Sequence, residues 1–300
     1  MTAPEHIRAI DGDGVEVCIH PVGMGSMAQK IHSEVVLLLG WGRAILLQLA
    51  HPLVACAIAE HSLFRAQRLR RLHRTLDAML ALTFGTPEDV GRISRAINAA
   101  HRGVRGKLRE RAGVFPAGTE YSARDPALLR WVHATLLDSF LRTYEFYIGS
   151  LAPEEKDRYC AETSGGVESL LGIPAGYLPR SVTELQTYMD KMLASGEITV
   201  TETACNLARE IVSPAVLWPG QPLVWLMQLP TIGLLPPAIR QAYGFPWDSR
   251  HEAALHLSAE LVRGLLPMAP SFLRHWGPSL NKTATRLFDL TNTSNWQSLR

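Results

Sequence analysis

Three histidines stand within otherwise apolar stretches in the first half of the sequence. His51 lies in LLQLAHPLV, His101 in SRAINAAHRGVRG and His133 in LLRWVHATLLDSF. An imidazole on an apolar helix face is either a core residue that donates to a backbone carbonyl or a ligand for a buried metal centre, because a neutral ring nitrogen serves both purposes. The residues by themselves leave both alternatives open for each histidine.

Helical spacing directs two of these histidines toward an apolar core. His101 continues a stripe with intervals of four, four and three, formed with Ile93, Ile97 and Val104. His133 shares the apolar side of its own predicted helix with Leu129, Leu136, Leu137 and Phe140. We therefore expect each imidazole to project into the core. There it can bind haem iron, and its second nitrogen then needs an acceptor that orients the ring.

Arg71 and Thr75 form a second candidate pair. They lie four residues apart in RLHRTLDAMLALTFG, and this spacing places them on one side of a helix. The arginine could orient dioxygen, hold a haem propionate or position a base, and the threonine hydroxyl could donate to bound oxygen. The alternative is a solvated basic face, since further arginines surround the pair at positions 65, 68, 70 and 74.

Other metal and nucleotide chemistries find no pattern in the sequence. It contains no H-E-x-x-H, no Glu-x-x-His pair, no G-x-S-x-G elbow, no P-loop and no dinucleotide-binding fingerprint. The four cysteines are far apart, which disfavours a thiolate metal site and covalent c-type haem and indicates reduced thiols in a cytosolic protein. A net charge of +2 provides no field that would attract nucleic acid.

One apolar stretch, residues 35–59, is long enough to cross a bilayer. It contains Arg43, Gln48, His51 and Pro52, and charged or polar groups at its centre are costly in a membrane. The stretch therefore predicts a buried core helix that breaks before Pro52, and no transmembrane segment. The N-terminal MTAPEHIRAIDGDG lacks the pattern of a secretory signal, so we predict a cytoplasmic location.

Helix-start signals recur along the chain, whereas strand-like pieces at 15–17 and 198–200 are too few for a core sheet. The starts are Thr86-Pro87-Glu88, Asp125-Pro126, and Ser181 with Glu184 as a capping box. These features predict a mainly α, multi-helix globular domain.

No linker rich in Ser, Gly and Pro divides the chain. We expect an N-terminal extension at 1–29, one helical domain at 30–265, and a C-terminal tail at 266–300 packed on that domain. Within the domain, residues 213–237 contain six prolines among apolar side chains. They predict an irregular apolar cover that cannot form one continuous helix, with contact to a membrane or an apolar substrate as the alternative.

The order of segments resembles a known catalytic domain. It runs from GWGRAILLQLAHPLVACAIAEHSLF through RLHRTLDAMLALTFG to DPALLRWVHATLLDSFLRTYE. This order, over about residues 30–265, is similar to the domain shared by latex clearing proteins (rubber oxygenases) and the fungal mpaB-type oxygenases. The resemblance implies a globin-like helical core and haem b (iron) bound without covalent links.

The resemblance also implies roles for the candidate residues. Arg71 and Thr75 match an R-x-x-x-T pair that lies over the haem, so they are the expected catalytic residues. His101, in HRGVR, matches the axial metal ligand, and His133 matches a further histidine at the haem site. We expect His51 and Arg71 to contact the cofactor too. Phe-Gly at positions 84 and 85 replaces the Tyr-Gly of the rubber enzymes. The secretion signal of those enzymes is also missing, and a cytosolic member without it would not meet polyisoprene, so that substrate is not carried over.

The sequence thus predicts a haem b-dependent oxygenase that uses O2 on a small apolar or aromatic substrate and oxidises or cleaves a C=C bond. One alternative is a haem protein that senses or carries without turnover. Another is a helical protein that binds an apolar ligand without a cofactor. The pattern predicts no nucleic-acid partner and leaves the oligomeric state open.

Overall fold

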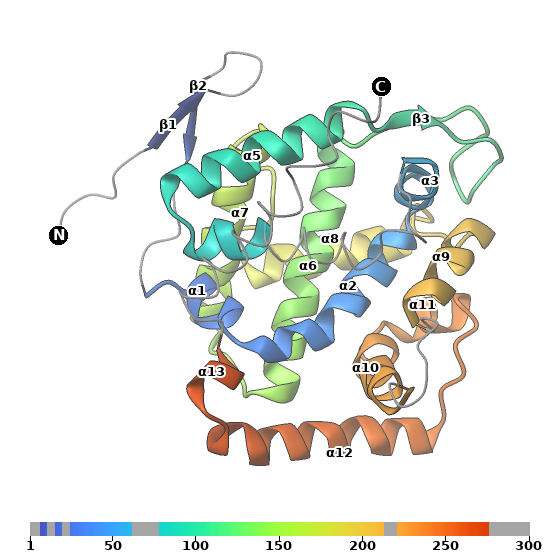
Figure 1. Ribbon diagram of the computed structural model, residues 1–300. Helices are drawn as coiled ribbons and strands as arrows, with labels where there is room; N and C mark the ends of the chain where they lie inside the picture. Colours follow the sequence, from blue (N-terminus) through green and yellow to red (C-terminus); the bar gives the residue numbers. More distant parts are fainter. Residues whose placement is uncertain (1–6, 11–15, 20–24, 62–77, 213–220, 276–300) are drawn as a thin grey trace.

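The computed structural model describes residues 7–10, 16–19, 25–61, 78–212 and 221–275 of the 300-residue chain. Its described part is mainly α, as predicted (Figure 1). The helices, besides a helical segment at 78–84, are α1 (Met27–His32), η1 (Val35–Leu37), α2 (Leu38–Leu49), α3 (Pro52–His61), α5 (Pro87–Arg102), α6 (Pro126–Tyr147), α7 (Pro153–Leu171), α8 (Val182–Ala194), α9 (Glu202–Val212), α10 (Gln221–Gly233), α11 (Pro237–Ala242), α12 (Ser249–Leu265), η2 (Leu266–Met268) and α13 (Ser271–Arg274).

The strands form two small antiparallel pairs at the periphery. β1 (Ile7–Ile10) pairs with β2 (Glu16–Ile19), and β3 (Arg105–Lys107) pairs with β4 (Glu120–Ser122). Neither pair contributes a layer to the core, which agrees with the expectation that strands are too few to build a core sheet. A helical body therefore carries the candidate site.

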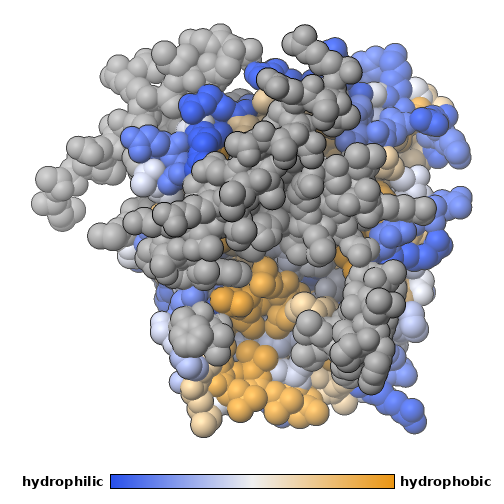
Figure 2. All heavy atoms as spheres, in the orientation of Figure 1, coloured by the Kyte–Doolittle hydropathy of each residue, from blue (hydrophilic) through white to orange (hydrophobic). Residues whose placement is uncertain are grey.

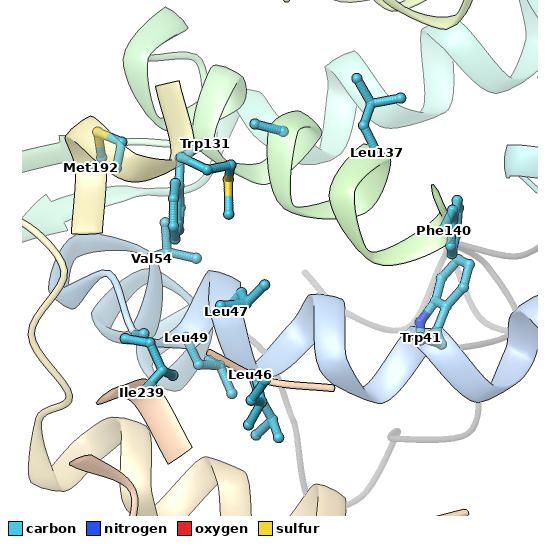
Figure 3. Packing of buried hydrophobic residues seen from close by; sticks show 14 of the residues in the cluster. Trp41, Leu46, Leu47, Leu49, Val54, Trp131, Leu137, Phe140, Met192 and Ile239 are labelled. Atoms are coloured by element: carbon cyan, nitrogen blue, oxygen red, sulfur yellow. The ribbon is translucent and has the colours of Figure 1, made fainter. Parts of the chain in front are cut away.

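Helix α6 runs through the middle of the molecule, with α2, α7, α8 and α12 packed around it (Figure 1). Asp125 caps its start, because the carboxylate accepts from the N–H of Ala127 at 2.9 Å, and Pro126 occupies the first turn, where no N–H is needed. The apolar sides of α2 and α6 meet in the core, as Figure 3 shows for Trp41 and Phe140, whose ring centroids lie 5.7 Å apart.

A glycine permits the close approach of α2 to α6. A Cβ on Gly40 would lie 2.1 Å from Oγ1 of Thr143 and 3.1 Å from the carbonyl oxygen of Ser139. We expect Gly40→Ala to lower the free energy of unfolding by about 1–3 kcal/mol, because the helices must separate to admit the methyl group. Urea titration followed by circular dichroism measures this.

Gly91→Ala on α5 is the matched control. Its new Cβ would meet nothing closer than 3.5 Å, so alanine should gain up to about 1 kcal/mol from its higher helix propensity. Equal destabilisation by both substitutions would contradict this account of the α2–α6 contact.

The apolar stretch at 35–59 is divided into helices, and it breaks before Pro52 as predicted. Residues Val35–Leu49 and Pro52–His61 form two arms bent by 104°. The arms are largely buried. Arg43 is only 1% exposed, and its pairing with Asp138 of α6 makes a buried charge possible there. Within the described residues, no single helix has the length and apolarity to cross a membrane, whereas this bent pair meets both criteria when its arms are taken together.

The other predicted helix starts are also present. Thr86 caps α5, because its hydroxyl accepts from the N–H of Asp89. The carboxylate of Asp89 accepts in turn from the N–H of Thr86. Ser181 caps α8 by accepting from the N–H of Glu184 at 3.1 Å. The predicted capping box differs by one residue, since the carboxylate of Glu184 accepts from the N–H of Arg180.

The prediction for 213–237 needs a correction. Residues 213–220 lie outside the described part, but α10 is helical from Gln221 to Gly233, where the sequence predicts irregular structure. The helix tolerates Pro222 because that residue lies in the first turn, and Pro230 is one turn from the end, so few hydrogen bonds are lost. The prolines at 236 and 237 then begin α11. As predicted, the region is not one continuous helix.

Helix α12 carries apolar residues on two sides. One side is buried through Leu255 and Ala259, whereas Leu257, Leu261 and Leu265 are 54–62% exposed on the other. Figure 2 shows hydrophobic residues along the lower edge of the molecule, where α12 runs. This side of α12 therefore leaves apolar surface uncovered.

Candidate functional site

His101 lies in the last turn of α5, which ends at Arg102. The prediction that Val104 continues its helical stripe is wrong, because the chain turns at Gly103 and the N–H of Val104 donates to the carbonyl of His101 at 3.2 Å. The imidazole is half-buried, and burial lowers its pKa, so the ring is neutral at pH 7. Among the described residues, none hydrogen-bonds either nitrogen of the His101 ring.

His133 is buried inside α6, as the spacing predicts. Its Nε2 lies 3.0 Å from Oγ of Ser164, and that hydroxyl donates to the carbonyl of Pro179 at 2.6 Å. Since Ser164 has only one proton to donate, it accepts from His133, and His133 carries its hydrogen on Nε2. Burial, with a smaller effect of nearby His32, lowers the pKa of His133 to about 3. The ring is therefore neutral, with a lone pair on Nδ1.

His32, which sequence reasoning missed, is a second buried imidazole in this region. Its Nδ1 lies 2.8 Å from Oγ1 of Thr83, and that hydroxyl donates to the carbonyl of Met79, so Nδ1 carries the hydrogen. Its Nε2 accepts from the hydroxyl of Tyr159 at 2.9 Å. Burial lowers the pKa of His32 to about 4. The only sequence signal is its place four residues after Ala28, on the buried side of a six-residue helix.

The tertiary structure brings the two buried histidines together. They are close enough that a charge on His32 would lower the pKa of His133. The ring of Phe140 packs edge-on against His32, with ring centroids 5.6 Å apart. Helices α1, α6 and α7 and the helical segment 78–84 thus converge on two neutral imidazoles. The predicted pair Arg71 and Thr75 lies outside the described residues, so its role at the site stays a prediction.

His51 lies at the corner between α2 and α3. Its Nδ1 accepts from the N–H of Leu53 at 3.3 Å, and its ring packs against Phe115 with centroids 5.3 Å apart. Burial lowers the pKa of His51 to about 4, so the ring stays neutral. These contacts give His51 a local role in starting α3, and its contact with a cofactor stays a prediction.

The donor chemistry of these residues fits haem. A porphyrin supplies four of the iron's ligands, so a single histidine suffices as the axial ligand from the protein. His32 has both ring nitrogens engaged, whereas His133 and His51 each have one engaged. His101 is neutral and has both nitrogens uncommitted within the described structure, so either could bind iron, but no described residue orients its ring, and its role as the iron ligand stays a prediction. In the same described ranges, no three or more His, Cys, Asp or Glu side chains cluster in a way that could hold a metal ion.

The class of protein follows from comparison of the whole chain with known families. The family model described as "ER-bound oxygenase mpaB/B'/Rubber oxygenase, catalytic domain" matches residues 29–264. The chain belongs to this family of oxygenase catalytic domains, which confirms the resemblance seen in the order of its segments.

Individual relatives are more distant. The chain is 26% identical over 225 residues to an uncharacterized protein of Mycobacterium bovis and, with the same values, to one of Mycobacterium tuberculosis. The matched region covers 73% of this chain and 84% of each relative. No solved structure matches the chain significantly, and the globin-like core stays a prediction.

Proposed function

We propose that this protein is a haem b-dependent oxygenase that acts in the cytoplasm on a small hydrophobic or aromatic substrate and oxidises or cleaves a C=C bond. Membership of the oxygenase family supports the reaction class. The observation that carries the haem assignment is His101, a neutral and partly buried imidazole with uncommitted nitrogens in the family's axial-ligand motif. The lack of a C-x-x-C-H motif supports non-covalent binding.

Each element of the site has a role in this proposal. His101 would hold the iron from the end of α5, and bound haem would supply the binding and activation of dioxygen. Arg71 and Thr75 would face the oxygen pocket. His133 would offer its Nδ1 lone pair there, and the apolar side chains of α2 and α6 would exclude water. The protein would thus bring dioxygen and an apolar substrate together in a dry cavity.

A visible spectrum after addition of haemin to the purified protein tests the cofactor. A Soret band that saturates at one haem per chain supports haem binding, and its absence favours a cofactor-free ligand-binding protein. Oxygen-dependent formation of an oxidised product from small olefins then separates an oxygenase from a haem sensor or carrier. Cell fractionation tests the location, and recovery of folded protein only from detergent-extracted membranes would contradict the cytoplasmic assignment.

His101→Ala is expected to lose most bound haem, because the substitution removes the protein's bond to iron and leaves apolar contacts alone. Haem content per chain after gel filtration measures the loss. His256→Ala, which removes an exposed imidazole on α12, is the control and should keep full occupancy. Full haem content in His101→Ala, together with loss in His133→Ala, would move the axial role to His133.

Arg71→Ala and Thr75→Ala should keep haem but slow oxygen-dependent turnover by roughly 10²–10³, the usual effect of losing one aimed donor at a reacting group. Single-turnover kinetics with an olefin that the wild-type protein oxidises measures the change. Arg158→Ala removes an exposed arginine from α7 and should leave the rate unchanged. Normal turnover in both pocket variants would assign the pair to a solvated basic face.

A further inference from the structure

Two hydroxyl groups determine where the buried histidines carry their hydrogens. Thr83 and Ser164 each donate to a backbone carbonyl, that of Met79 at 2.8 Å and that of Pro179 at 2.6 Å. Each hydroxyl can therefore only accept from the histidine beside it. The result is His32 with its hydrogen on Nδ1 and His133 with its hydrogen on Nε2.

Described residues account for every ring lone pair of these two imidazoles except one. Nε2 of His32 accepts from Tyr159, whose pKa burial raises, so that its hydroxyl stays a donor. Nδ1 of His133 has no partner among the described residues. A neutral lone pair of this kind binds a metal or accepts from an O–H or N–H group, and it cannot donate.

We propose that Ser164 is a positioning residue for His133, which it holds as the Nε2–H tautomer so that His133 offers a hydrogen-bond acceptor to the oxygenase site. Ser164 suits this role because it is fully buried and its own proton is held by Pro179, in the segment between α7 and α8. Without its oxygen, either ring nitrogen of His133 can carry the hydrogen. The inference rests on the proposed function only in placing His133 at that site.

The acceptor character of His133 restricts the ligand that it serves. A purely hydrocarbon substrate has nothing to donate to Nδ1, whereas an apolar molecule with a hydroxyl or an N–H group does. The substrate class that fits is therefore a hydrophobic molecule that carries one such donor. Its hydrogen bond to Nδ1 would orient the molecule in an otherwise apolar cavity.

The first test measures the tautomer in the haem-free protein by ¹⁵N NMR of the imidazole nitrogens. The wild type should show His133 protonated only on Nε2, and Ser164→Ala should add a population protonated on Nδ1. Ser169→Ala is the matched control on the same helix, because its hydroxyl donates to the carbonyl of Gly165 and touches no histidine. Ser164→Thr restores the hydroxyl and should restore the single tautomer. If Ser164→Ala does not fold, Ser164→Cys, with a weaker acceptor of similar size, replaces it.

The second test uses carbon monoxide as the probe on reduced, haem-loaded protein. Ser164→Ala should keep its haem content but shift the C–O stretching frequency in the infrared, and Ser169→Ala should leave the frequency unchanged. A single Nε2–H tautomer in Ser164→Ala, or an unchanged C–O frequency, would overturn the positioning role. If the wild type binds no haem, the proposed function fails, and the role of Ser164 at an oxygenase site fails with it. The NMR result then still decides whether Ser164 sets the tautomer.

Discussion

Lowering the pH from 7 to 4 is expected to remove most of the free energy of unfolding of this protein. Burial lowers the pKa of His32 and of His51 from 6.5 to about 4, and burial with the nearby His32 lowers that of His133 to about 3. These rings stay neutral in the folded state between pH 6.5 and pH 4, whereas in the unfolded chain they bind protons.

The sign of the effect follows from that difference. Because the unfolded state binds more protons in this window, the free energy of unfolding increases with pH and reaches its full value above about pH 6.5. Each histidine contributes up to about 1.4 kcal/mol per pH unit. At pH 4 the three together cost on the order of 10 kcal/mol, as much as the whole stability of a typical domain.

Urea titrations at pH values between 7 and 4 measure this dependence. His32→Asn keeps a donor for Thr83 but removes one titrating group, so it should lower the slope against pH by about one proton. His256→Asn, at an exposed histidine on α12, is the control for the substitution itself. A free energy of unfolding that is constant from pH 6.5 to pH 4.5 would contradict the burial of neutral histidines.

Asp138→Ala should lower the free energy of unfolding by about 3–5 kcal/mol, because it leaves the charge of Arg43 buried without a partner. Nη2 of Arg43 lies 2.6 Å from the Asp138 carboxylate, and its other nitrogens donate to Ser139 and to the carbonyl of Leu234. Burial raises the pKa of Asp138, but Arg43 and Arg142 outweigh it and hold the pKa below its usual value. Both partners are therefore charged. Arg43 joins α2 to α6 through Asp138 and to the end of α10 through the carbonyl of Leu234.

Urea denaturation at pH 7 measures this cost. Arg142 is the outer partner of the same carboxylate, and its side chain is 58% exposed. Arg142→Ala should therefore cost less than about 1 kcal/mol. Replacing both buried partners, as Arg43→Met with Asp138→Leu, should recover most of the loss, since no lone charge then stays buried. Equal and small effects of Asp138→Ala and Arg142→Ala would show that the buried pair does not hold these helices together.

Local features of this fold could be predicted from the sequence because they depend on neighbours within a few residues. Thr86, Asp125 and Ser181 start helices where the sequence places them, since each side chain caps backbone N–H groups two or three residues ahead. The break before Pro52 follows in the same way from the ring of proline. Three local features differ from the prediction: the end of α5 before Val104, the helix at α10, and the capping box of α8, where Glu184 accepts from Arg180. Gly103 ended one helix early, and the prolines of α10 fell near its ends.

Contacts between distant segments account for what the sequence did not determine. His32 bonds to Thr83 and Tyr159, which lie 51 and 127 residues away, and Arg43 pairs with Asp138 at a separation of 95 residues. No spacing rule links such residues, because their contact depends on how helices pack.

His133 combines one property that its sequence position determined with another that only the tertiary structure decided. Its place on an apolar helix face determined, from the sequence, that the imidazole would be buried. Which of its nitrogens carries the hydrogen was decided only by the tertiary structure, because the acceptor, Ser164, belongs to α7, and the carbonyl that holds the serine's own proton belongs to the segment that follows α7.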